Sequence, residues 1–163
     1  MTRRPIFVIT VSDSAAAGTR RDLSGPAVQA RLRSLGWDAQ VQVLPDEPDI
    51  VANHLIRLAD EDNAAAVFTT GGTGIASRDR TPEATRAVLE LEIPGIGEWM
   101  RNEGRRQTPT AILSRGIAGT RGRTLIVNLP GSPTGAVESL DSIIGVVSHA
   151  LDLLEGRTEH RGN

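Results

Sequence analysis

Thr69-Thr-Gly-Gly-Thr-Gly-Ile-Ala-Ser-Arg-Asp-Arg-Thr-Pro-Glu-Ala-Thr85 is the stretch from which the organisation of this chain can be worked out. Three glycines within four residues follow an apolar run, and an Arg-Asp-Arg triplet then precedes a helix start. This order leaves successive backbone N–H groups free, beside a carboxylate and two guanidinium groups. Such a loop suits phosphate together with a metal ion, although a tight turn between a strand and a helix is the simpler alternative.

Apolar periodicity on both sides of this loop predicts alternating strands and helices. Continuous apolar runs predict buried strands over residues 6–11, 64–69 and 124–129. Alternation over residues 40–43 predicts an edge or half-buried strand. Helical spacing predicts helices over residues 25–36, after Pro48, from Thr81 as the cap, and after Ser132-Pro133. Residues 94–122 should hold a short helix and one or two short strands. The expected fold is a three-layer α/β/α domain with a mainly parallel central sheet, spanning residues 1–163.

Polar or glycine-rich turns follow four of the predicted strands. In chain order they are Ser12-Asp13-Ser14, Pro45-Asp46-Glu47, the glycine loop Gly71-Gly-Thr-Gly74 and Pro130-Gly131-Ser132. Each turn alone is ordinary, because strand–helix loops favour these residue types. The carboxyl ends of parallel strands meet at one edge of a sheet, where α/β proteins bind ligands. Their joint placement therefore predicts a binding site at that edge.

Asp79 and Asp46 are the candidate metal ligands. Mg²⁺ uses one or two carboxylates together with substrate phosphates, and both aspartates follow predicted strands. The alternative for Asp79 is a solvated salt bridge with the arginines that flank it. The three histidines are scattered away from the strand ends, which argues against a Ser-His-Asp hydrolase.

Composition excludes several classes of protein. The 163 residues contain no cysteine and no lysine, so thiol nucleophiles, disulfides and a Walker A loop are ruled out. A net charge of −2 favours neither nucleic acid nor an anionic membrane surface. No apolar run approaches the length of a membrane span, and no signal peptide is recognisable, so a cytoplasmic protein is expected.

The chain resembles the MogA/MoaB family of molybdenum cofactor biosynthesis. The resemblance is carried by the glycine loop with Arg78-Asp79 and Thr81-Pro82-Glu83-Ala84, and by further motifs in the same order. These motifs are Val11-Ser-Asp, Pro45-Asp46-Glu47, Pro94-Gly-Ile-Gly-Glu98, Ala111-Ile-Leu-Ser-Arg115 and Asn128-Leu-Pro-Gly-Ser-Pro133. Together they cover roughly residues 6–155.

The resemblance implies a domain that binds molybdopterin and transfers AMP to it from Mg·ATP, with release of pyrophosphate. It implies that Asp46 and Asp79 are the catalytic, metal-linked aspartates. It further implies that the substrates are bound by Ser12, Asp13, Thr70, Gly71, Gly72, Thr73, Gly74, Glu98, Ser114, Pro130, Gly131 and Ser132.

The resemblance also implies a homotrimer, with a hexamer as the alternative, and docking to a molybdenum-insertion protein is a further expectation. Ser14 stands where many members of the family have arginine, which removes one phosphate contact. A molybdopterin carrier without catalytic activity is therefore the alternative function, although a carrier would not need both aspartates.

Overall fold

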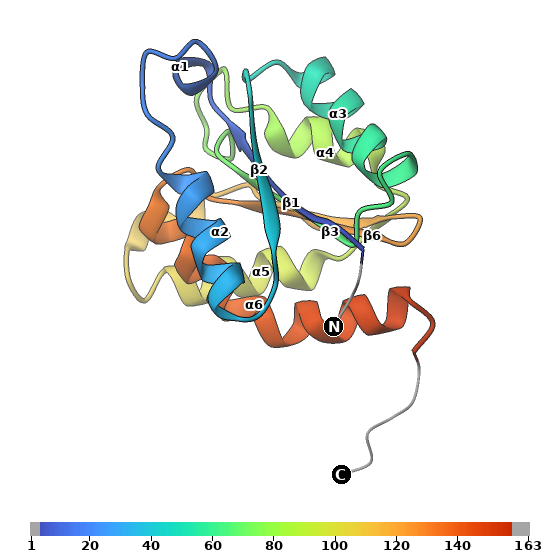
Figure 1. The fold of residues 1–163 in the computed structure, drawn as a ribbon. Helices are drawn as coiled ribbons and strands as arrows, with labels where there is room; N and C mark the ends of the chain where they lie inside the picture. The colour runs from blue at the N-terminus through green and yellow to red at the C-terminus, as the bar shows by residue number, and fades with distance from the viewer. Residues whose placement is uncertain (1–3, 158–163) are drawn as a thin grey trace.

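The computed structural model describes residues 4–157, so residues 1–3 and 158–163 of the predicted single domain lie outside the described part (Figure 1). The strands are β1 Ile6–Val11, β2 Ala39–Leu44, β3 Ala66–Thr70, β4 Leu91–Glu92, β5 Ala118–Arg121 and β6 Thr124–Leu129. The helices are α1 Asp13–Ala16, α2 Ser24–Ser34, α3 Pro48–Asp60, α4 Thr81–Val88, α5 Pro94–Gly104 and α6 Pro133–Leu154, with a 3₁₀ turn, η1, at Pro109–Leu113.

The strands form one sheet in the order β2-β1-β3-β6-β5-β4. β2, β1, β3 and β6 run parallel, whereas β5 pairs antiparallel with β6 and β4 pairs antiparallel with β5. The mainly parallel sheet is thus confirmed, and β2 is an edge strand as its alternating sequence predicts. Because β1, β2, β3 and β6 are parallel, the four turns that follow them lie at the same edge of the sheet.

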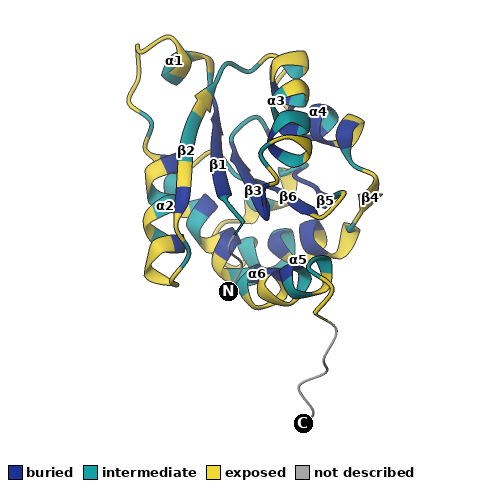
Figure 2. Cartoon of the chain, turned by 45° about the vertical axis from the view of Figure 1, so that its right-hand side comes forward, coloured by how far each residue is buried: buried dark blue, intermediate teal, exposed yellow. Residues whose placement is uncertain are grey.

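Two apolar cores lie on the two faces of the sheet. Alternate strand residues such as Val8 and Phe68 pack with α2, α5 and α6, whereas Ile9 and Val67 pack with α3 and α4. Figure 2 shows β1, β3 and β6 buried between helices that expose their outer faces. The three-layer α/β/α fold follows from this arrangement, because each parallel strand needs cover on both faces.

The helix starts agree with the predictions except at α4. Ser132 caps α6, where its Oγ accepts from the Gly135 N–H at 3.0 Å. Thr81 was expected to cap α4, but α4 begins at Thr81 itself, and Arg80 precedes it without a side-chain cap. The Thr81 side chain is fully buried and faces the glycine loop instead. Among residues 4–157, no helix has both the length and the apolar character that a membrane span requires.

Candidate active site

The strand order reverses at β1 and β3, and two cavities open at this point. From β1 the chain moves outward to β2 and then returns to β3 on the other side of β1. A cavity of about 170 Å³ lies between the ends of β1 and β3, and Thr10, Ser12, Thr70 and Gly71 line it. A larger cavity, of about 450 Å³, lies beyond the glycine loop. Gly131 lines both cavities, and a crevice at a reversal of strand order is where α/β sheets bind ligands.

The glycine loop separates these cavities and depends on its glycines. Gly71 and Gly72 have φ angles of 93° and 66°, which residues other than glycine rarely adopt. A methyl group at Gly131 would lie 3.2 Å from the Gly71 Cα, so the turns after β3 and β6 touch at their glycines. Backbone without side chains therefore lies where the two cavities adjoin.

Asp13 and Arg78 join the turns after β1 and β2 to the glycine loop. Arg78 Nε donates to Asp13 Oδ2 at 2.7 Å, and its Nη2 donates to Glu47 Oε1 at 2.9 Å. Asp13 Oδ1 accepts from the Asp46 N–H at 2.9 Å. The hydrogen bond from Arg78 lowers the pKa of Asp13. Asp13 is therefore occupied in holding the turns together.

Asp46 carries a carboxylate in an unfavourable place for negative charge. Its burial and the charges of Asp13 and Asp79 raise its pKa to about 6. A methyl group at Gly72 would lie 3.3 Å from Asp46 Oδ2 and 2.2 Å from Thr81 Oγ1, so both oxygens face the same point of the loop. Thr81 Oγ1 is buried and has no hydrogen-bond partner among the described residues. Oxygen ligands beside unbalanced negative charge are the surroundings that a hard cation prefers.

Asp79 lies at the larger cavity on the other side of the loop. Its Oδ2 accepts from the Ala76 N–H at 3.0 Å, and a methyl group at Gly74 would lie 2.8 Å from the same oxygen. In residues 4–157, no three acidic or histidine side chains gather closely enough to bind a metal ion by themselves. Mg²⁺ that is bound together with phosphates needs only one or two carboxylates from the protein, and Asp46 and Asp79 are carboxylates that follow β2 and β3.

The larger cavity combines apolar walls with a few polar groups. Ile75, Met100 and Leu113 contribute apolar surface, and Asn128 lies at the base. Asn128 is buried; its Nδ2 donates to Thr69 Oγ1 at 3.0 Å and to Thr85 Oγ1 at 2.9 Å. Apolar walls with a few well-placed polar groups are typical of a pocket that binds a small organic molecule.

The structure brings most of the predicted site residues to these cavities. The larger cavity is lined by Gly72, Thr73, Gly74, Asp79, Ser114, Pro130, Gly131 and Ser132, and the smaller one by Ser12, Thr70, Gly71 and Gly131. Glu98 lies outside both: it lines an adjoining depression with Arg86 and Glu92, which shares Gly97, Arg101 and Ser114 with the larger cavity. Asp13 and Asp46 also line neither of the two cavities. Asn128 begins one of the motifs that carry the resemblance but was not among the predicted site residues; the signal for it was an amide inside a mostly apolar strand.

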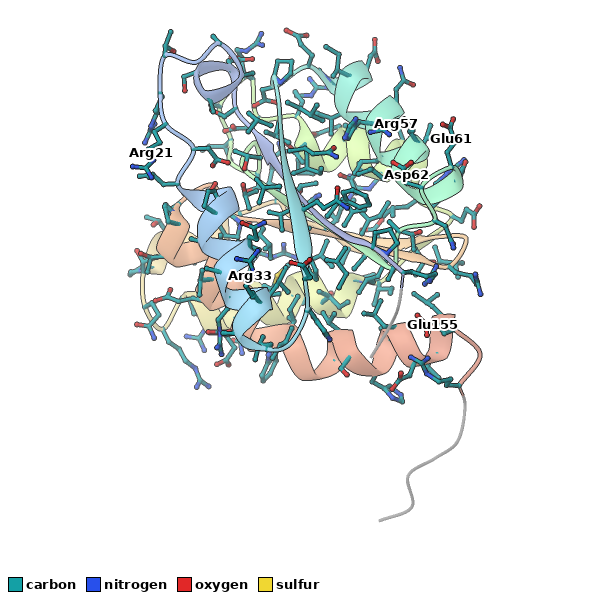
Figure 3. All side chains as sticks on the ribbon, viewed as in Figure 1. Arg21, Arg33, Arg57, Glu61, Asp62 and Glu155 are labelled. Atoms are coloured by element: carbon teal, nitrogen blue, oxygen red, sulfur yellow. The ribbon has the colours of Figure 1, made fainter. Side chains whose placement is uncertain are left out.

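Two of the histidines lie away from this edge in helices. His54 in α3 is half-buried, and its Nε2 lies 2.5 Å from Gln42 Oε1. Burial and the neighbouring Arg57 lower the pKa of His54. Arg57 pairs with Asp62 at 2.8 Å near the end of α3, where Figure 3 shows both side chains. His149 is exposed on α6, and His160 lies outside the described residues.

Comparisons with known proteins agree with this architecture. Residues 7–149 match the family model described as a probable molybdopterin binding domain. The molybdopterin adenylyltransferase of Helicobacter pylori strain J99 is 42% identical over 154 residues, which are 93% of this chain and 88% of the relative. The Escherichia coli K12 enzyme of the same name is 39% identical over 166 residues, covering 93% and 85%.

Solved structures show the same fold. The molybdopterin biosynthesis enzyme MoaB of Thermus thermophilus superimposes with a TM-score of 0.88 at 47% identity, covering 94% of this chain and 97% of that one. The Mog protein of Mycobacterium ulcerans gives a TM-score of 0.86 at 41% identity, covering 93% and 99%. With the family model matching residues 7–149 and these relatives covering nearly its whole length, the chain belongs to the molybdopterin-binding domain family of molybdenum cofactor biosynthesis.

Proposed function

We propose that this chain is a molybdopterin adenylyltransferase, which transfers AMP from ATP to the terminal phosphate of molybdopterin. The observation that carries the proposal is the pair of cavities that meet at Gly131 and the glycine loop. A transfer between two substrates needs two adjoining sites with the reacting phosphates between them. The relatives named as molybdopterin adenylyltransferases, at 39–43% identity, support the same activity.

The larger, partly apolar cavity is the proposed molybdopterin site, and the smaller, more polar one receives the nucleotide. In the reaction, a terminal phosphate oxygen of molybdopterin bonds to the α-phosphorus of ATP. The bond from that phosphorus to the oxygen that bridges to the β-phosphate breaks, and pyrophosphate leaves. The N–H groups of the glycine loop orient the phosphates, and the glycine contact between Gly71 and Gly131 lets them approach the backbone closely.

Asp46 and Asp79 are the residues that would hold Mg²⁺ in this proposal. When bound, Mg²⁺ would neutralise charge on the pyrophosphate leaving group. Asp13 keeps the turn that contains Asp46 in place, because it accepts from the Asp46 N–H and is itself held by Arg78. The two aspartates come from turns that follow different strands, so they would approach the phosphates from different turns.

A turnover assay with purified protein, molybdopterin, ATP and Mg²⁺ tests the proposal. We expect adenylylated molybdopterin and pyrophosphate, neither of which should form when Mg²⁺ is chelated. Asp79→Asn should abolish turnover and leave pterin binding largely intact. Asp60→Asn is the matched control, because Asp60 pairs with Arg121 away from the cavities. Tight pterin binding by the wild-type protein without any product would instead indicate the carrier.

Assembly and location complete the proposal. A homotrimer, with a hexamer as the alternative, remains a prediction that analytical ultracentrifugation can test, because the monomer mass is 17.3 kDa. Docking to a molybdenum-insertion protein and residence in the cytoplasm likewise remain predictions.

A further inference from the structure

Backbone carbonyl groups of the glycine loop are held by one side chain, Arg115. Its Nε donates to Gly74 O at 2.7 Å, and its Nη2 donates to Asp79 O at 2.6 Å. The backbone N–H of Arg115 also donates to Thr73 O at 2.8 Å. A loop that turns N–H groups toward a phosphate turns carbonyl groups the other way, and partly buried carbonyl groups need donors. Arg115 supplies these donors.

Arg115 comes from a distant part of the chain, and its positive charge is balanced by the carboxylate of Glu83. It lies between η1 and β5, 41 positions after Gly74. Its Nη1 donates to Glu83 Oε1 in the first turn of α4, and Nη2 lies 3.5 Å from Glu83 Oε2. The hydrogen bond from Arg115 lowers the pKa of Glu83, so the pair is ionised at neutral pH. Arg115 lines a depression outside the larger cavity, so it contacts the loop from behind.

We propose that Arg115 is a positioning residue for adenylyl transfer. By holding Gly74 and Asp79 through their carbonyl oxygens, it keeps the loop N–H groups and the Asp79 carboxylate where the phosphates meet. This inference rests on the proposed function. The planar guanidinium group donates to both carbonyl oxygens and to Glu83 from three different nitrogens, whereas the three donors of lysine all lie on one nitrogen.

The test compares Arg115→Ala and Arg115→Lys with the control Arg121→Ala. Arg121 also joins a carboxylate to a carbonyl group, donating to Asp60 at 2.7 Å and to Val88 O at 3.1 Å, but it does so away from the loop. Because a displacement of 1 Å can reduce rates about 100-fold, we expect kcat to fall on the order of 50-fold in both Arg115 variants. The KM for molybdopterin should stay within about threefold, since binding groups remain. Arg121→Ala should keep its kcat at a similar loss of stability.

Two further readouts separate positioning from a general loss of structure. Added guanidinium ion should restore part of the turnover of Arg115→Ala, because it can fill the vacated site. Hydrogen exchange of residues 71–79 should be faster in Arg115→Ala than in wild type and unchanged in Arg121→Ala.

Two results would overturn the proposal: unchanged kcat with unchanged exchange of the loop, or a raised KM at constant kcat, which would make Arg115 a substrate contact. If the wild-type protein shows no turnover, the proposed function fails. The exchange measurement then still decides whether Arg115 holds the loop.

Discussion

Replacing Asp46 by asparagine should stabilise the folded protein while impairing its use of nucleotide and metal. Burial, together with the negative charges of Asp13 and Asp79, raises the pKa of Asp46 to about 6 from its ordinary value of 3.8. Arg78 offsets this only in part, because its guanidinium group is bound to Asp13 and Glu47. Asparagine has nearly the same shape and carries no charge, so it removes the repulsion without leaving a gap.

The sign and size of this effect follow from proton linkage. The folded protein holds the Asp46 proton more tightly than the unfolded chain, so ionisation lowers stability as the pH rises from about 4 through 6, and the loss is complete above about pH 7. The difference between the two pKa values corresponds to about 3 kcal/mol. Because Asp46 is only partly buried, solvent screening reduces this value, and we expect about 1 kcal/mol at pH 8, or about 3 °C in Tm.

Urea unfolding followed by tryptophan fluorescence at several pH values measures the effect. Asp46→Asn should be more stable than wild type at pH 8, and its advantage should shrink as the pH is lowered from 6 toward 4. Asp60→Asn is a control that should be less stable than wild type at pH 8. The hydrogen bond from Arg121 lowers the pKa of Asp60, so the charged carboxylate stabilises the folded protein. The reasoning is refuted if Asp46→Asn is equally or less stable at pH 8, or if its advantage does not depend on pH.

Three further substitutions test the geometry. Gly72→Ala should abolish turnover, because the new methyl group would lie 2.2 Å from Thr81 Oγ1 at a φ of 66°; activity near the wild-type level in the turnover assay would contradict this. Asn128→Ala should lower the free energy of unfolding by about 2–4 kcal/mol, since it leaves the buried Thr69 and Thr85 hydroxyl groups without their donor; a urea titration showing less than about 1 kcal/mol would argue against it. Ser132→Ala should lower stability by about 1 kcal/mol through the loss of the α6 cap, as thermal unfolding can measure, and an unchanged Tm would exclude the cap.

Local patterns predicted most of the elements because each depends on neighbouring residues. The run Ile6–Val11 forms β1 and Thr124–Leu129 forms β6 over the predicted residues, and Val51, Leu55 and Leu58 of α3 are buried as their spacing predicts. The prediction that Thr81 caps α4 was wrong because of a tertiary contact. Local preference makes Thr81 a good cap, but packing against Gly72 buries its side chain.

The sequence by itself determined the alternation of strands and helices, the mainly parallel sheet and the set of turns that gather at one edge, because periodicity and turn chemistry act over a few residues. Only the tertiary structure decided that β3 lies between β1 and β6, which brings Gly71 against Gly131 and places a cavity on each side of the glycine loop. Only the fold, likewise, brings Arg115 to Gly74 and turns Glu98 away from the larger cavity. These relations join residues far apart in the chain, and they follow from how whole elements pack, which no local pattern records.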